Sequence, residues 1–92
     1  MSTGCDIPYL LERVSELLNQ NGEPEWGKSF RRLSIEFSTG PAETCRKILS
    51  TYGGMGSFND IVLHSPSGIP LSAENDELDQ LRSKLYSGCR EF

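Results

Sequence analysis

The sequence predicts an α+β fold, mostly α, in which three to four helices pack with one short β-hairpin at about residues 60–71. Apolar residues recur at the three- and four-residue spacing of helices in several segments, and Gly or Pro separates these segments. A short apolar run at 61–63 precedes a turn sequence, which indicates a strand and its reversal. The chain of 92 residues contains no repeat and no linker composition, so we expect a single small globular domain, 1–92.

The first helix is expected after Asp6 and Pro8, which are typical cap and first-turn residues. Gly22 suits the left-handed conformation that often ends a helix. Between them the apolar residues follow the i, i+3, i+4 pattern of a stripe that faces a core: Ile7, Leu10, Leu11, Val14, Leu17 and Leu18.

A second helix is expected from Pro24. Trp26, Phe30, Leu33 and Phe37 follow it at spacings that place all four on one helical seam. Residues 33–37 also alternate as a strand does. We favour a helix, because a strand would leave Trp26 and Phe30 without a shared face.

The third helix, the hairpin and the last helix follow in that order. Pro41 can begin the third helix and Gly53 can end it. The strand 60–64 leads into Ser65-Pro66-Ser67-Gly68, a type I turn sequence, and residues 69–71 can return as a second strand. Asn75 is expected to cap the last helix, whose seam consists of Leu78, Leu81, Leu85 and Cys89.

The net charge of −4 argues against non-specific nucleic-acid binding, because phosphates would be repelled at long range. The same charge is compatible with a basic protein partner. Basic residues concentrate in the second and third helices, where they form either a solvated surface or, less favoured, a helix-turn-helix surface for DNA. These residues are Lys28, Arg31, Arg32, Arg46 and Lys47.

Several function classes have no support in the sequence. Three widely separated cysteines and one histidine, His64, do not form a zinc-ligand pattern, so we expect no metal and no cofactor. No nucleophile elbow is present, so we expect no enzyme. No apolar segment is long enough to span a membrane and no leader sequence opens the chain, so we expect a cytoplasmic protein with no membrane partner.

The glycine-rich segment Gly53–Ser57 is the most conspicuous candidate site. A phosphate-binding loop runs from a strand through glycines into a helix, whereas this segment follows a helix and precedes a strand. We therefore interpret the glycines as a helix end and a reversal. The alternative is a small anionic-ligand or nucleotide site, which would be lined by Tyr52, Gly54, Gly56, Ser57 and His64.

The favoured hypothesis is a non-enzymatic protein-binding module that acts on an unknown protein partner as a monomer or weak homodimer. Acidic side chains would steer the partner and Trp26 would anchor it. Each candidate also has a structural interpretation: Trp26 as a core residue, Asn59 and Asp60 as partners of the loop amides, and the acids as helix-cap charges. The predicted surface consists of Trp26, Phe58, Asn59, Asp60, Glu74, Asp76 and Glu77.

Two segments, Ile48–Leu63 (ILSTYGGMGSFNDIVL) and Leu78–Tyr86 (LDQLRSKLY), resemble a family of small uncharacterised bacterial proteins, a domain of unknown function. The resemblance covers residues 24–92. It implies a bacterial cytosolic protein and brings no catalytic residues. By analogy with small acidic antidotes to toxins, we hypothesise an immunity-like inhibitor of a basic partner.

Overall fold

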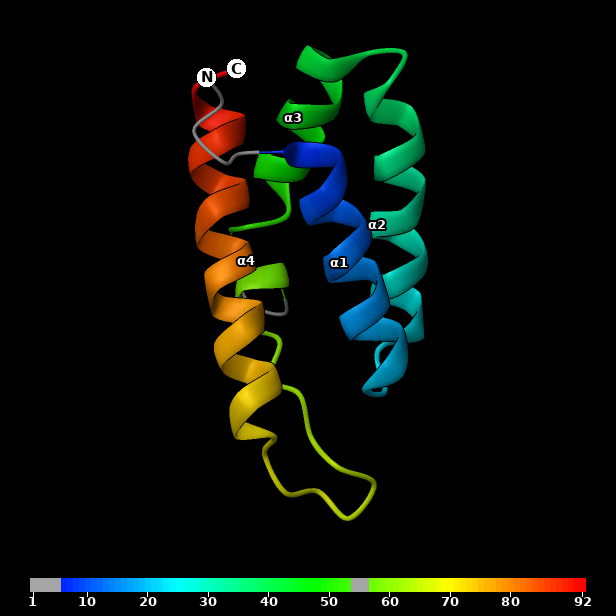
Figure 1. The fold of residues 1–92 in the computed structure, drawn as a ribbon, viewed down its shortest axis with the longest axis vertical. Coiled ribbons are helices and arrows are strands. Elements are labelled where there is room, and N and C mark those ends of the chain that lie inside the picture. The colour runs from blue at the N-terminus through cyan, green and yellow to red at the C-terminus, as the bar shows by residue number, and fades with distance from the viewer. Residues whose placement is uncertain (1–5, 54–56) are drawn as a thin grey trace.

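The computed structural model describes residues 6–53 and 57–92, and these residues form an all-α fold (Figure 1). The helices are α1 (Ile7–Gln20), α2 (Pro24–Phe37), α3 (Pro41–Ser50) and α4 (Ser72–Arg90), with a short 3-10 helix, η1 (Phe58–Asp60), before α4. No strand or sheet is present in the described parts of the chain. The predicted α+β class is therefore wrong.

The predicted hairpin at 60–71 is reduced to one isolated bridge between His64 and Pro70. The chain does reverse at the expected turn, where Gly68 has a φ of 89° and its N–H donates to the Ser65 carbonyl at 2.8 Å. The Leu71 N–H donates to the Leu63 carbonyl at 2.9 Å, but the reciprocal bond is not made. Instead, the Leu63 N–H donates to Asn75 Oδ1 at 2.7 Å. The Leu63 N–H, which would donate to a second strand in a hairpin, thus donates to a side chain of α4.

α1 and α2 form an antiparallel pair joined by a tight turn at Gly22, whose φ of 89° requires glycine. The two helices approach closely at Gly27, whose carbonyl accepts a hydrogen bond from Ser15 Oγ at 2.8 Å. Residues 33–37 lie in α2, so the preference for a helix over a strand is confirmed.

α4 runs along the other side of the molecule and closes the core (Figure 1). It begins at Ser72, so Asn75 is not its cap; Asn75 lies in the first turn and bonds the preceding loop. The core is built from apolar residues of every helix and of the loop before α4. Its largest fully buried side chains are Phe30, Phe58, Leu11, Leu18, Ile48, Leu63, Leu78, Leu85 and Val14.

Candidate functional site

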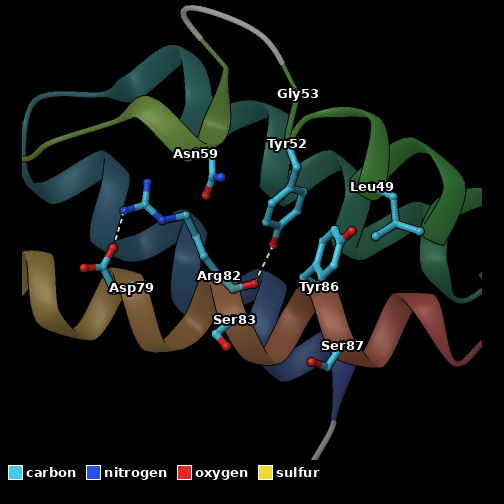
Figure 2. A pocket seen from close by; sticks show the side chains of 9 residues that line it. All are labelled: Leu49, Tyr52, Gly53, Asn59, Asp79, Arg82, Ser83, Tyr86 and Ser87. Carbon is cyan, nitrogen blue, oxygen red and sulfur yellow. Dashed lines mark hydrogen bonds and ion pairs between the residues drawn. The ribbon is translucent and has the colours of Figure 1, made fainter.

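An open groove of about 650 Å³ lies between the end of α3, η1 and the middle of α4 (Figure 2). α4 forms one wall, and the segment after α3 together with η1 forms the other. The lining combines two tyrosines with small polar side chains and one ion pair: Leu49, Tyr52, Gly53, Asn59, Asp79, Arg82, Ser83, Tyr86 and Ser87.

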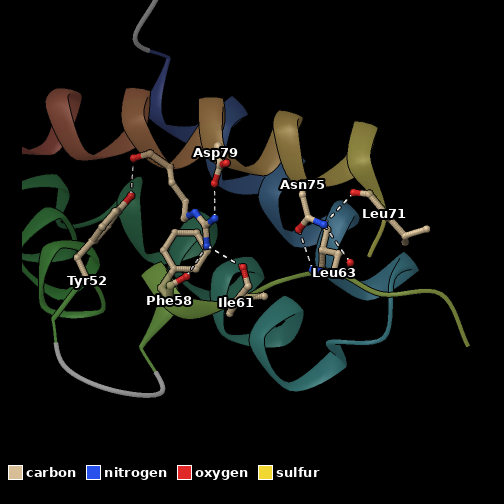
Figure 3. A network of polar contacts seen from close by, with 8 residues as sticks. Tyr52, Phe58, Ile61, Leu63, Leu71, Asn75 and Asp79 are labelled. Carbon is tan, nitrogen blue, oxygen red and sulfur yellow. Dashed lines mark hydrogen bonds and ion pairs between the residues drawn. The ribbon is translucent and has the colours of Figure 1, made fainter. Parts of the chain in front are cut away.

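Arg82 is the most constrained polar residue of the groove. Only 8% of it is exposed, and its Nη1 donates to the carbonyls of Phe58 at 2.8 Å and Ile61 at 3.1 Å (Figure 3). Its Nη2 pairs with the Asp79 carboxylate, and the guanidinium carbon lies 5.7 Å from the centre of the Phe58 ring. These partners engage the positive charge, so Arg82 supports the wall of the groove and is not an open anion receptor.

Tyr52 and Tyr86 give the groove an aromatic surface. Their ring centres lie 5.1 Å apart, and Tyr52 Oη donates to the Arg82 carbonyl at 2.8 Å (Figure 2). Burial raises the pKa of the Tyr52 phenol above its ordinary value, so the hydroxyl stays a donor at neutral pH. Tyr86 is 40% exposed, and its ring lies 5.7 Å from the guanidinium of Arg90. Tyr86 therefore has exposed ring surface for a ligand, and the guanidinium of Arg90 already makes a cation–π contact with it.

Exposed acids flank the groove along α4. Asp76 and Asp79 are one helical turn apart, and Ser83 follows Asp79 on the same face. The Asp79 side chain is 67% exposed even though it pairs with Arg82. On η1, Asn59 and Asp60 are exposed, and Asn59 lines the groove. The Asp79 carboxylate thus lines the same groove as the two tyrosines, nearer to the N-terminus of α4 than Tyr86.

Two predicted surface residues lie in an aromatic cluster behind the groove. Phe58 is fully buried, with its ring 4.4 Å from Phe30 and 5.4 Å from Tyr52. Its expected role as a partner-facing residue is therefore corrected to core packing, because the 3-10 turn directs the ring inward. Trp26 is half-buried and lies 5.9 Å from the Phe58 ring. Its packing agrees with the core interpretation, and only part of the ring is left for a partner.

The predicted acids Glu74, Asp76 and Glu77 do not form one surface. Glu77 makes a two-pronged ion pair with Arg13 of α1, at 2.5 Å to Nε and 2.9 Å to Nη2, which lowers the pKa of the Glu77 carboxyl. Glu74 and Glu77 line the same small cleft between α1 and α4, whereas Asp76 is exposed and does not line that cleft.

The alternative anion site is not assembled in the described residues. Gly54 and Gly56 lie outside them, Gly53 lines the groove, and Ser57 is buried. His64 lines a different groove, with Val62 and the turn between α1 and α2, so it does not meet Tyr52. Of the basic residues, Lys28, Arg31 and Arg32 share a groove on α2, while Lys47 pairs with Glu36 at 2.9 Å.

The sequence analysis overlooked Asp79, Arg82 and Tyr86 as groove residues. A signal for Arg82 was present, because it falls four residues after Leu78 and three before Leu85, inside the apolar stripe of α4. An arginine in such a stripe must find partners in the core, and here the carbonyls of the η1 region supply them.

Comparisons with known proteins identify a family but not an activity. The model of a family described as a domain of unknown function (DUF6966) matches residues 19–72, more than half of the chain, so the chain belongs to this family. The predicted resemblance to a small domain of unknown function is thereby confirmed. No curated protein matches the chain, and no solved structure matches it.

Two properties of the described residues bear on ligands and membranes. Within residues 6–53 and 57–92, no three His, Cys, Asp or Glu side chains are arranged to hold a metal ion. Over the same residues, no helix has the length and apolar composition of a membrane span.

Proposed function

We propose that this member of a family of unknown function is a non-enzymatic module that binds a basic segment of a protein partner in the groove between α3, η1 and α4. One observation carries the proposal: the exposed Tyr86 ring stands in the same groove as the exposed carboxylate of Asp79. A cation that lies over an aromatic ring gains about 0.5–2 kcal/mol, depending on how far it is desolvated. The nearby carboxylate adds a charge-assisted hydrogen bond.

The groove chemistry favours binding over catalysis. Its described hydroxyl groups are those of Ser83, Ser87 and the two tyrosines, and no histidine, cysteine or lysine lines it in the described residues. Nucleophilic catalysis by a serine needs an adjacent base. The carboxylate that lines the groove, that of Asp79, is already engaged in an ion pair with Arg82.

Charge supports a basic partner. The chain has a net charge of −4, Asp79 lines the groove, and Asp60 and Asp76 are exposed on η1 and α4, the elements that form its walls. Such an arrangement speeds association with a positively charged surface and loses its effect as salt is added. Inhibition of a basic toxin, as by an immunity protein, is the specific form of this proposal, and small size and acidic charge are its support. We place this activity in the cytoplasm and assign it to a monomer or weak homodimer.

A pull-down from the native host tests the proposal. The full chain serves as bait at low and at high salt, in comparison with Tyr86→Ala and with the control Tyr9→Ala. Tyr9 is an exposed tyrosine of α1, 60% exposed and absent from the groove lining. We expect the wild type and Tyr9→Ala to retain a basic protein at low salt, and Tyr86→Ala to lose it.

High salt should release the same protein from the wild-type bait. Absence of a retained basic protein at both ionic strengths would refute the proposal. So would retention by Tyr86→Ala equal to that by the wild type, because the aromatic face would then have no part in binding.

A further inference from the structure

α2 carries a basic stripe on the face opposite its core residues. Trp26 and Phe30 pack inward against Phe58. On the opposite side, a cation or apolar residue recurs at i, i+3, i+4 and i+7, which places all four residues within an arc of about 100°. This basic stripe consists of Lys28, Arg31, Arg32 and Ile35.

The basic stripe borders a shallow groove between α1 and α2. The groove has a volume of about 340 Å³ and is lined by the four stripe residues together with Asn19 of α1 and Glu36 of α2. Ile35, which is 66% exposed, is the apolar residue of this lining.

Among the described residues, the cations of the stripe share their lack of an ion pair with Arg46 and Lys84, but they are grouped around one exposed apolar side chain. Arg13, Lys47 and Arg82 each form an ion pair with a carboxylate of the same chain. Over residues 6–53 and 57–92, Lys28, Arg31 and Arg32 form none. Three unpaired cations around an exposed aliphatic side chain are complementary to a surface that alternates carboxylates with an apolar residue.

We propose that the basic stripe of α2 docks an acidic amphipathic segment of a second protein partner. Glutamate or aspartate side chains of the segment pair with Arg31 and Arg32, whose guanidinium groups bind carboxylates in a two-pronged geometry. An apolar side chain of the segment packs on Ile35 and on the aliphatic stem of Lys28. The segment then lies as a third element in the groove between α1 and α2.

Two features favour a protein segment over a nucleic acid or an anionic membrane. The stripe extends over about two helical turns, roughly 10 Å, and Glu36 lines the same groove, so a phosphate backbone would soon meet a carboxylate. Ile35 would also remain exposed beneath a phosphate backbone, whereas an amphipathic protein segment buries it.

The stripe is separate from the groove of the proposed function. Figure 1 shows α2 and α4 at opposite edges of the molecule, and no described residue lines both grooves. One surface is acidic and aromatic, and the other is basic and aliphatic. The protein can therefore hold a basic partner and an acidic partner at the same time.

The test uses a fluorescently labelled peptide of about 15 residues in which Glu and Leu follow helical spacing, titrated with the full chain. The variant Arg32→Glu is compared with Lys84→Glu, an exposed cation of α4 whose replacement lowers the net charge equally. We expect Arg32→Glu to weaken binding about tenfold and Lys84→Glu less than about twofold, because only Arg32 contacts the peptide. Circular dichroism verifies that both variants remain folded.

Three results would overturn the proposal. The first is no binding of the peptide, and the second is equal weakening by Arg32→Glu and Lys84→Glu, which would leave only long-range charge. The third is tighter binding of a thymidine oligonucleotide or of phosphatidylglycerol vesicles than of the peptide. Tyr86→Ala should bind the peptide as the wild type does, so this result is independent of the groove on α4.

Discussion

The α1–α2 pair and the segment 57–71 are both anchored in the core, but different interactions hold them. α1 and α2 satisfy their backbone groups within each helix and pack through apolar side chains such as Leu18 and Phe30. The segment 57–71 contains one 3-10 turn and one isolated bridge, so most of its backbone groups need partners elsewhere. Two side chains of α4, Asn75 and Arg82, supply several of these partners (Figure 3).

Those two side chains act as substitutes for a strand. Arg82 donates to the carbonyls of Phe58 and Ile61, and Asn75 bonds the N–H and carbonyl of Leu63 and the carbonyl of Leu71. A buried backbone group without a partner costs about 1–3 kcal/mol, so these contacts decide whether the segment stays in place. Since η1 forms a wall of the groove on α4, they also hold the proposed binding site in shape.

Among the variants considered, Arg82→Ala should destabilise the segment 57–71 most strongly. It removes the charged donor of two carbonyls, of which the Phe58 carbonyl keeps a 3.4 Å bond from the Ile61 N–H, and we expect the free energy of unfolding to fall by about 3 kcal/mol. Urea denaturation followed by circular dichroism measures the loss. Lys84→Ala, a change of an exposed cation on the same helix, should cost less than about 0.5 kcal/mol.

Native-state hydrogen exchange locates the effect of Arg82→Ala. The Phe58 N–H, which donates to the Thr51 carbonyl at 2.8 Å, should lose more protection than the amides of α1. Equal loss in both regions would mean that the segment 57–71 and the α1–α2 pair unfold as one unit, which contradicts the distinction drawn between them.

The variant Asn75→Ala should have the next largest effect, a loss of about 2 kcal/mol in the free energy of unfolding. It removes the 2.7 Å bond to the Leu63 N–H and the bonds from Nδ2 to Leu63 and Leu71. The measurement is urea denaturation together with exchange of the Leu63 amide, which should accelerate. Asn19→Ala is the matched control, because Asn19 is exposed and its Nδ2 makes one long bond, 3.4 Å, to Ser15 Oγ.

A Leu63 amide that stays protected in Asn75→Ala would indicate that the Leu71 carbonyl takes over as its acceptor. The hairpin would then form without help from α4. That result would restore part of the β structure that the sequence predicts for residues 60–71.

The sequence was sufficient to predict the helices, because their signals are local. The apolar stripe of α1 and the seam from Trp26 to Phe37 in α2 each correspond to one buried helix face. The strand signal at 61–63 also has a local meaning: Ile61 and Leu63 are buried while Val62 is 49% exposed, as in an extended chain.

The sequence does not reveal which group forms hydrogen bonds with the extended residues 61–63. A strand needs a hydrogen-bonding partner, and the sequence pattern does not say whether another strand or a side chain supplies it. Here Asn75 supplies it from twelve residues away, and its position early in a helix suggested a cap instead. The groove was missed for a similar reason, because Tyr52 and Tyr86 meet only through the long-range packing of α3 on α4.

The smallest expected effect belongs to the ion pair between Arg13 and Glu77, the exposed counterpart of the buried Arg82. About a third of each side chain is exposed, so Glu77→Gln should lower the free energy of unfolding by no more than about 1 kcal/mol at pH 7. Glu16→Gln, which removes a single 3.2 Å contact with the same arginine, should cost less.

The stabilisation by the ion pair between Arg13 and Glu77 should decrease as the pH is lowered. The ion pair lowers the pKa of Glu77 in the folded state below its ordinary value of about 4.3, so the stabilisation is fully present above that value. It is lost as the pH falls through the folded-state pKa, where the carboxyl takes up a proton. Denaturation curves of the wild type and Glu77→Gln should therefore differ at pH 7 and converge as the pH falls through the folded-state pKa of Glu77. A difference that persists after the Glu77 carboxyl has taken up its proton, as followed by an NMR titration, would show that Glu77 stabilises α1 against α4 through packing of its side chain and not through its charge.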